Sequence, residues 1–249
     1  MNEIEYDSIA RLYDIYASTD YDFAFFTNEV AQDGPKVLEL TSGTGRISIQ
    51  LIEAGADLTC VDISQGMLDV LTEKLTSLNY SARVLCSDIE QLSFKLEFDL
   101  AIFPFQSFME LIGSEKQLNA LLAIYRSLKL GGRFMCTLHN PVVRRRSADG
   151  VLRLVGRFQT GDGMLVVSGF EEDRSPVVER SQLFEYSDKS GILEWKRLLN
   201  MHFELIEKEA FEEMASKVGF KMVELFGNYD YTPFSAKHSP VMIWVLQKP

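Results

Sequence analysis

The stretch Val37–Arg46, VLELTSGTGR, runs from an apolar strand pattern directly into two glycines. A strand followed by glycines is typical of the first turn of a doubly wound sheet, where a ligand lies against backbone amides at a helix N-terminus. A dinucleotide-binding turn has glycines spaced G-x-G-x-x-G, and here Gly43 and Gly45 are followed by Ser48. The spacing therefore disfavours a nicotinamide dinucleotide.

Short apolar runs alternate with longer helical periods around this turn, which is the α/β pattern. We expect strands over 37–41, 57–62, 82–86, 98–103 and 132–138, and helices over about 45–54, 64–79 and 114–130. These spacings suit right-handed crossovers in a parallel sheet.

The helix ends carry local signals. Ser64 is expected to cap the second helix, and Ser114 with Gln117 has the spacing of a capping box. The pair Gly131-Gly132 is expected to end the third helix.

The C-terminal part breaks the alternation. A helix over 207–218, ended by Gly219, precedes the apolar runs FKMVELF and SPVMIWVLQ, which only about a dozen residues including Pro233 separate. This connection is too short for a crossover helix, so the last two strands are expected to be antiparallel. The sequence thus predicts a Rossmann-like, mostly parallel seven-stranded sheet with an antiparallel last strand.

Residues 142–206 have a different pattern, with apolar runs separated by the turn segments TGDG, EEDRSP and SDKSG. We expect an inserted small antiparallel β-sheet here, and a core formed by residues 1–141 and 207–249. The excursion leaves from the end of the fifth strand, at the edge where the glycine turn also lies. The inserted sheet is expected either to cover a substrate pocket, which we favour, or to form a homodimer interface.

Composition limits the kind of partner. A net charge of −11 and a pI near 4.8 disfavour nucleic acid. The N-terminus lacks the pattern of a signal peptide and no run reaches the ~18 to 20 apolar residues of a membrane span, so we expect a cytoplasmic protein without a membrane partner. Cys60, Cys86 and Cys136 lie in strand-like runs without metal-ligand spacing, so we expect buried small side chains and neither a disulfide nor a metal.

Three acidic residues end successive strands. Glu39 ends the first, Asp62 lies nineteen residues after Gly43, and Asp88 follows the third. A carboxylate at the second strand end is well placed to accept the hydroxyls of a ribose, and one at the third to meet an adenine amino group. Each aspartate alone is as well explained by a turn or helix cap. All three together favour a ligand site.

The chain resembles the class I S-adenosylmethionine-dependent methyltransferases over nearly its whole length. VLELTSGTGR resembles the first motif of that family, Asp62 its ribose-binding acidic position, and SDIEQLSF its adenine-binding loop. FDLAIFPFQSF resembles the fourth-strand motif, and LKLGGRFMCTLHNP the glycine turn and fifth strand.

The resemblance implies S-adenosyl-L-methionine as cofactor. It places Glu39, Gly43 and Gly45 around the methionine part, Asp62 and Ile63 at the ribose and adenine edge, Met67 at the adenine face, Asp88 and Ile89 at the adenine polar edge, and Phe103 at the reacting centre. Thr41 stands where the family often has its first glycine, and because threonine disfavours positive φ we expect extended backbone there. Acidic residues suit a cofactor that is cationic at sulfur and ammonium.

The first 30 or so residues contain an amphipathic helix with Ile9, Leu12, Tyr13 and Tyr16 on one face. The resemblance implies that this helix is a lid over the cofactor, and Tyr13 is then a cofactor contact. The alternative is a helix packed for stability alone.

Catalytic residues are not evident from the sequence. Tyr13 and His139 are the weak candidates, and a structural role for His139 is the stronger alternative. The run Arg144-Arg145-Arg146 is expected to be a solvated loop, or else to attract an acidic substrate group. Candidate substrate contacts are Arg144, Arg153, Trp195 and Arg197.

The predicted function is methyl transfer from S-adenosylmethionine to a nitrogen, oxygen or carbon atom of a small molecule, with catalysis mainly by proximity and alignment. The alternative from another class is a non-catalytic regulator that binds S-adenosylmethionine with the same fold. A nicotinamide-dependent oxidoreductase ranks third because the glycine spacing fails.

Overall fold

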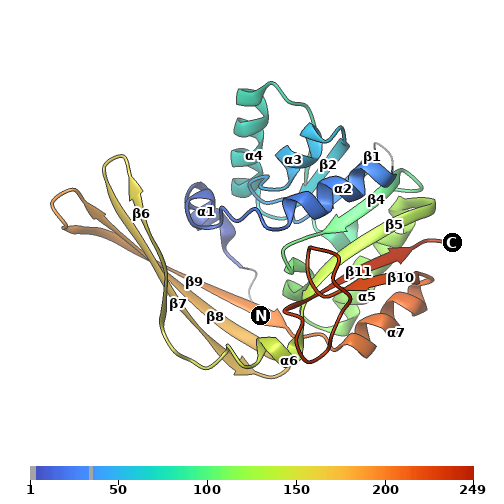
Figure 1. Cartoon of the computed structure of the whole chain (residues 1–249). Helices are drawn as coiled ribbons and strands as arrows, with labels where there is room; N and C mark the ends of the chain where they lie inside the picture. The colour runs from blue at the N-terminus through green and yellow to red at the C-terminus, as the bar shows by residue number, and fades with distance from the viewer. Residues whose placement is uncertain (1–3, 34–35) are drawn as a thin grey trace.

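The computed structural model describes residues 4–33 and 36–249 (Figure 1). Residues 1–3 of the expected lid lie outside the described part. The core is a seven-stranded sheet in the order β10-β11-β5-β4-β1-β2-β3. Its strands are β1 (Lys36–Leu40), β2 (Asp57–Asp62), β3 (Arg83–Cys86), β4 (Phe98–Phe103), β5 (Leu128–His139), β10 (Lys221–Phe226) and β11 (Val241–Gln247).

The strand directions confirm the predicted fold class. Strands β1 to β5 pair in parallel, and β11 is antiparallel to both β10 and β5. Strand β11, with six consecutive buried residues in Val241–Gln247, is apolar because both of its faces are covered.

Helices cover both faces of this sheet (Figure 1). One face packs against α5 (Ser114–Ser127) and α7 (Lys208–Val218), the other against α2 (Phe23–Asp33), α3 (Ser48–Glu53) and α4 (Gln65–Leu78). Helix α4 shows why the sequence folds this way. Met67, Leu68, Leu71 and Leu75 form its buried face, and the Ser64 hydroxyl accepts the Met67 amide at 3.1 Å, which confirms the predicted cap.

Helix α5 starts at Ser114 as predicted, but its predicted cap and its predicted end are wrong. Gly113 at φ 98 caps this helix, and the Gly113 amide donates to the Glu204 carboxylate at 2.6 Å, so a tertiary contact replaces the expected Ser114 and Gln117 box. The helix ends at Ser127. The pair Gly131-Gly132 lies inside β5 and does not end the helix. Gly131, at φ 77, donates its amide to the Lys248 carbonyl at 2.8 Å, and this contact with the C-terminal chain fixes the irregular start of β5.

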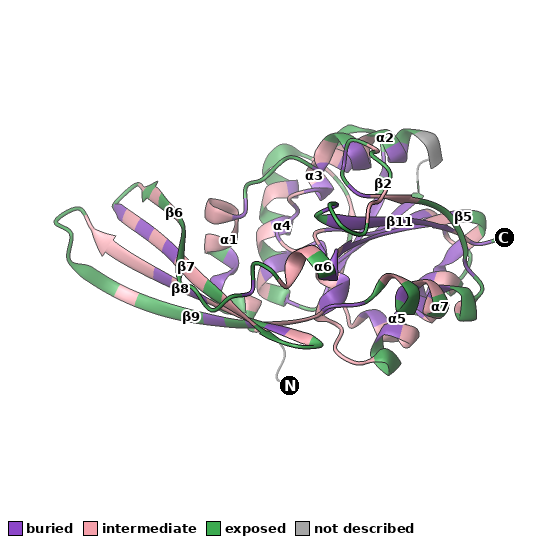
Figure 2. Cartoon of the chain, turned by 60° about the horizontal axis from the view of Figure 1, so that its bottom comes forward, coloured by how far each residue is buried: buried purple, intermediate pink, exposed green. Residues whose placement is uncertain are grey.

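The expected inserted sheet is present as a separate four-stranded antiparallel sheet in the order β6-β7-β8-β9. Its strands are β6 (Arg153–Thr160), β7 (Gly163–Arg174), β8 (Val177–Asp188) and β9 (Leu193–Glu204), and the short helix α6 (Pro141–Arg144) leads into it from β5. Burial alternates along β7 and β8, as Figure 2 shows. One face of the sheet is therefore covered.

The covered face packs on the N-terminal segment. This segment is the 3-10 helix η1 (Tyr6–Ile9) followed by α1 (Ala10–Tyr16), and it lies between the inserted sheet and α4 (Figure 1). Leu165, Val167, Phe184, Leu199 and Met201 of the sheet share an apolar cluster with Ile9, Ala10 and Met67.

Two further expectations concern single residues and the membrane. Cys60 and Cys136 are buried, but Cys86 is exposed because β3 is the edge strand, so the expectation of three buried cysteines is wrong for Cys86. Within residues 4–33 and 36–249, no helix combines the length and the apolar character that crossing a membrane requires.

The glycine turn allows a test of its packing. Gly45 has φ 84, and a Cβ built there lies 2.3 Å from Leu71 Cδ1. We expect Gly45→Ala to lower the free energy of unfolding by roughly 1–3 kcal/mol more than Gly55→Ala, because only the former overpacks α4. Gly55 is the matched control, since its φ is 95 and a Cβ built on it has nothing within 4 Å. Urea denaturation measures both, and equal losses would contradict the packing role.

Candidate functional site

A pocket of about 260 Å³ lies at the carboxyl ends of the parallel strands. Its walls are Ile4, Tyr6, Thr41, Asp62, Ile63, Ser87, Asp88, Ile89, Glu90, Phe103, Ser107, Glu110, Leu111, Ile112, Lys116 and His202. Five of the residues predicted for the cofactor, namely Asp62, Ile63, Asp88, Ile89 and Phe103, are among them. The structure thus brings together the ends of β2, β3 and β4.

Asp62 joins the glycine turn to the second strand. Its Oδ2 accepts the Gly43 amide at 2.8 Å and its Oδ1 accepts the Ser64 amide at 2.9 Å. Burial raises the pKa of Asp62, and the hydrogen bonds from the backbone amides act in the opposite direction. Asp62 is therefore both a backbone cap and a wall of the pocket.

Asp88 has the same double character. Its Oδ1 accepts the Glu90 amide at 2.9 Å and caps the 3-10 helix η2 (Ile89–Gln91), while its side chain lines the pocket. The cap and the ligand-site interpretations of these aspartates are thus compatible.

Glu39 and Ser48 lie beneath the glycine turn and outside the pocket walls. The Ser48 hydroxyl donates to Glu39 Oε2 at 2.6 Å, and the Cys60 thiol lies 3.9 Å from the same oxygen. Burial raises the pKa of Glu39 to about 8. The serine in place of a third glycine thus holds a buried carboxyl group.

The expectation for Thr41 is wrong. Its φ is 56, in the left-handed region, although the residue is not a glycine. The Thr41 hydroxyl donates to the Leu40 carbonyl at 2.6 Å, and the next residue, Ser42, donates its amide to the Val61 carbonyl at 3.0 Å. These bonds hold the turn in a conformation that the side chain alone disfavours.

The N-terminal segment is fastened to the glycine turn and to α4. Asp14 accepts the Thr44 hydroxyl at 2.6 Å and pairs with Lys74 at 2.5 Å, and Asp7 accepts the Gly66 amide at 2.9 Å. Tyr13 packs edge-on between Tyr6 and Tyr16. Tyr13 and Met67, like Glu39, Gly43 and Gly45, are outside the set of pocket walls, so their cofactor contacts stay a prediction.

Glu110 is the main functional candidate that the sequence did not indicate. It follows β4 at the end of the 3-10 helix η3 (Ser107–Glu110), and the Tyr6 hydroxyl donates to its Oε1 at 2.9 Å. Burial raises the pKa of Glu110 to about 7, and the hydrogen bond from Tyr6 opposes this effect. Lys116 and His202 are further pocket residues that the sequence did not reveal. The only local signal was the position of Glu110 after the fourth strand.

The two weak catalytic candidates, His139 and Tyr13, are buried, and burial shifts the pKa of each. Burial, with Arg144 and Arg180 nearby, lowers the pKa of His139 to about 3, so this imidazole is uncharged and a weak base at neutral pH. Burial and the neighbouring carboxylate of Glu110 raise the pKa of Tyr13.

The four candidate substrate contacts form two groups. Arg144 ends α6 and pairs with Glu171, so the arginine run begins in a short helix and not in the expected solvated loop. Arg153 pairs with Asp149 at 2.6 Å. Both arginines line a second cavity. Trp195 stacks on Tyr186, and Arg197 lies 5.3 Å from the Trp195 ring, both near the start of β9.

Fold and pocket together define a Rossmann-like protein with an acidic pocket at its strand ends. Residues 37–132 match the family described as "Methyltransferase domain". This match, the relatives named below and the solved structures with the same fold support an S-adenosylmethionine-dependent methyltransferase.

Similar proteins cover most of the chain. Cypemycin N-terminal methyltransferase of a Streptomyces species is 26% identical over 226 residues, which are 87% of this chain and 84% of that protein. Glycine/sarcosine N-methyltransferase of Aphanothece halophytica is 25% identical over 220 residues, 87% of this chain and 78% of that protein. The CcbJ methyltransferase from Streptomyces caelestis shares the fold with a TM-score of 0.84 at 21% identity, covering 100% of this chain and 99% of that structure.

Glu39 allows a prediction about stability and pH. Because its folded pKa of about 8 lies above the ordinary value of 4.5, the folded state keeps a proton that the unfolded state loses, and stability falls as pH rises toward 8. We expect Glu39→Gln, which still accepts the Ser48 hydroxyl, to gain roughly 3 kcal/mol relative to the original protein between pH 5 and pH 8. Urea unfolding at both pH values measures this gain. Glu209→Gln on the exposed side of α7 is the control, and an equal gain there would contradict the assignment to Glu39.

Proposed function

We propose that this enzyme transfers the methyl group of S-adenosylmethionine to an amino nitrogen of a small molecule, and that donor and acceptor meet in the pocket at the strand ends. The observation that carries the proposal is the buried Glu110 carboxyl group on the same pocket as Asp62 and Asp88. The names of two relatives support a nitrogen acceptor, since one is called an N-terminal methyltransferase of cypemycin and the other a glycine/sarcosine N-methyltransferase.

The chemistry of the pocket walls fits the cofactor. Asp62, Asp88, Glu90 and Glu110 face one lysine, Lys116, and an excess of carboxylates suits a cationic ligand. The Ser42 hydroxyl oxygen in the glycine turn is buried without a hydrogen-bond partner among the described residues, and nothing lies within 4 Å of a Cβ built on Gly43. The turn therefore leaves both a polar atom and room for a ligand.

The roles of the binding residues follow from their chemistry. Asp62 would accept ribose hydroxyls, Asp88 an adenine amino group, and Ile63 and Ile89 would contact the adenine ring. Phe103 would lie near the reacting centre. Bound S-adenosylmethionine supplies an electrophilic methyl group.

Glu110 would remove the proton that makes an ammonium group non-nucleophilic. A general base is most effective when its pKa lies near the working pH, and burial has brought the pKa of Glu110 to about 7. The Tyr6 hydroxyl, 2.9 Å away, fixes the orientation of the carboxylate. Alignment of the acceptor would supply the rest of the rate enhancement.

The N-terminal segment would close this pocket. Ile4 and Tyr6 are part of its walls, and with the segment in this position they would exclude water from the reacting groups. The same segment packs against the inserted sheet, so the lid and the insertion would cover the acceptor together.

The first prediction for this function concerns the cofactor. We expect Asp62→Ala to weaken binding of S-adenosylmethionine and S-adenosylhomocysteine by about tenfold or more, since a hydrogen bond to a charged group contributes roughly 1.5–3 kcal/mol. Calorimetry measures the dissociation constants, and thermal melting shows whether the turn remains folded. Asp57→Ala, at the exposed start of the same strand, is the control. An unchanged dissociation constant in Asp62→Ala would remove Asp62 from the site.

The second prediction concerns the chemical step. We expect Glu110→Gln to lower kcat/KM for an amine acceptor by about a hundredfold or more while changing S-adenosylhomocysteine binding little. In the original enzyme the rate should rise as pH passes through about 7, because the carboxylate must be ionised to accept a proton, and this limb should vanish in the variant.

The assay for this prediction is transfer of labelled methyl to a panel of small amines. Glu115→Gln, an exposed carboxylate at the start of α5, is the matched control. A Glu110→Gln enzyme with the original rate and pH profile would show that Glu110 is not the base. Tight cofactor binding without methyl transfer to any acceptor would favour a regulator instead.

A further inference from the structure

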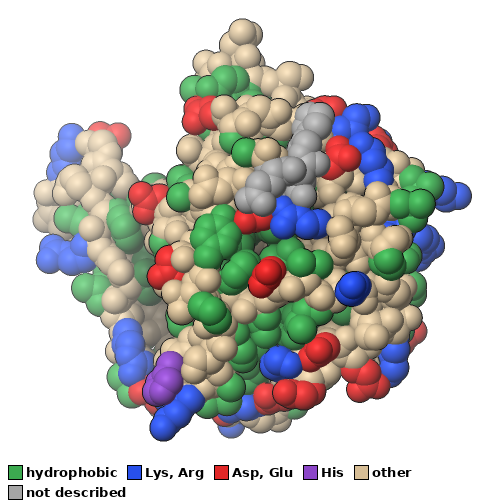
Figure 3. Space-filling model, turned by 45° about the vertical axis from the view of Figure 1, so that its right-hand side comes forward, with side chains coloured by type: hydrophobic (Ala, Val, Ile, Leu, Met, Phe, Trp, Pro, Cys, Tyr) green, Lys and Arg blue, Asp and Glu red, His purple; other side chains and the backbone are tan. Residues whose placement is uncertain are grey.

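A second cavity, of about 560 Å³, lies where α6 and the loop after it meet the inserted sheet. Its walls are Arg144, Arg146, Ser147, Val151, Arg153, Val155, Gly169, Phe170, Glu171, Arg180 and Gln182. Four of these residues are arginines and one is a glutamate, in a chain whose net charge is −11. On the face drawn in Figure 3, by contrast, acidic and basic side chains are interspersed.

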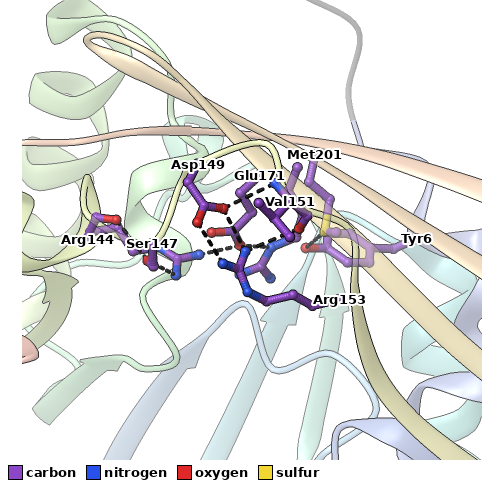
Figure 4. A network of polar contacts seen from close by, with 9 residues as sticks. Tyr6, Arg144, Ser147, Asp149, Val151, Arg153, Glu171 and Met201 are labelled. Carbon is purple, nitrogen blue, oxygen red and sulfur yellow. Dashed lines mark hydrogen bonds and ion pairs between the residues drawn. The ribbon is translucent and has the colours of Figure 1, made fainter.

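The carboxylates around this cavity do not balance its arginines. Glu171 pairs with both Arg144 and Arg180 through one oxygen, and Asp149 pairs with Arg153 (Figure 4). The side chain of Arg146 has no hydrogen bond or ion pair with any residue in the described ranges 4–33 and 36–249. The cavity therefore keeps an excess of positive charge, which attracts an anion.

Gln182 provides a second, independent sign of a ligand. Only 7% of this residue is exposed, and its Oε1 is buried with no hydrogen-bond partner among the described residues. An unpaired buried amide oxygen is costly. A ligand that satisfies it must bring a donor, which is a hydroxyl or an amino group.

Arg180 connects this cavity with the proposed active site. It projects from β8, lies 5.1 Å from the Phe203 ring, and its charge lowers the pKa of Glu110. Strand β9, which pairs with β8, contacts η3, and η3 ends at Glu110, so the inserted sheet extends from the arginines to the walls around Glu110.

We propose that the arginine cavity binds an anionic group, phosphate or carboxylate, that carries a hydroxyl or amino donor, and that this group belongs to the methyl acceptor. The acceptor part of this inference rests on the proposed function. Arg144, Arg146 and Arg180 contact the anionic oxygens, and Gln182 accepts from the donor. The insertion is then the element that selects the acceptor.

The binding test uses simple anions and calorimetry. Inorganic phosphate carries an O–H donor and sulfate at neutral pH does not, so we expect phosphate to bind several-fold more tightly than sulfate. Gln182→Leu should abolish this difference and raise the melting temperature, because it removes an unpaired buried oxygen. Glycolate, a carboxylate with an adjacent hydroxyl, is the second probe, and the tighter of phosphate and glycolate identifies the anionic group.

Charge is tested with a matched pair of arginines. Arg146→Gln should weaken binding of the preferred anion by about tenfold. Arg157→Gln, an exposed arginine of β6 outside the cavity, should leave it unchanged. Absence of binding by both phosphate and glycolate, or equal binding by the original protein, Arg146→Gln and Gln182→Leu, would overturn the anion site.

The link to the acceptor has its own measurement. Among amines that receive labelled methyl, those with a phosphate or carboxylate should be preferred at least tenfold over neutral ones, and Arg146→Gln should remove this preference by raising KM while kcat stays the same. Equal use of neutral amines would overturn the assignment to the acceptor. S-adenosylhomocysteine binding, measured on the same samples, separates the two proposals. Anion binding without cofactor binding would contradict the proposed function and leave the anion site supported.

Discussion

The geometry of the site depends on the Asp62 carboxylate, which accepts one amide from the glycine turn and one from the start of α4. A parallel sheet brings strand ends to one edge but does not fix the loops that follow them. By bonding Gly43 and Ser64 at once, Asp62 holds two such loops against each other. Burial disfavours the charged form of Asp62, and the two amide hydrogen bonds replace part of the hydration that the carboxylate loses.

The N-terminal segment is the second feature that fixes the geometry of the pocket. Asp14 holds it to the glycine turn, Asp7 to α4, and Tyr6 to Glu110. Its other side packs against the inserted sheet through residues such as Tyr16 and Phe184, whose rings lie 5.2 Å apart. Because one short segment contacts the turn, α4, the pocket and the insertion, a change in its position alters all four. If the segment is the lid that we propose, these contacts would couple closure of the pocket to the position of the insertion.

The sequence predicted the sheet, its antiparallel end and the separate antiparallel sheet, because strand and helix periods and loop lengths are local properties. It also predicted that Asp62 and Asp88 lie at strand ends, because each is at or just after the end of an apolar strand pattern. It did not reveal Glu110, because burial raises the pKa of this residue only in the folded protein and its hydrogen-bond partner Tyr6 lies 104 positions away. Gly113 caps α5, and its amide donates to Glu204, 91 positions away. This long-range hydrogen bond replaces the local capping box that was predicted at Ser114. Arg180 and Gln182 lie within a regular strand, and only the folded arrangement shows that they face a cavity.

The distribution of charge over the two cavities favours one orientation of a proposed acceptor. Carboxylates surround the pocket at the strand ends, and arginines surround the cavity beneath the insertion. A molecule with an amine at one end and an anionic group at the other is attracted when its amine faces the carboxylates and its anion faces the arginines. In the reverse orientation both ends meet like charges. Ion pairs made and desolvated in this way select more strongly by geometry than by affinity, because each misplaced charge is left buried without a partner. If methyl transfer here relies mainly on alignment, as we propose, a fixed orientation of the acceptor is itself a catalytic contribution.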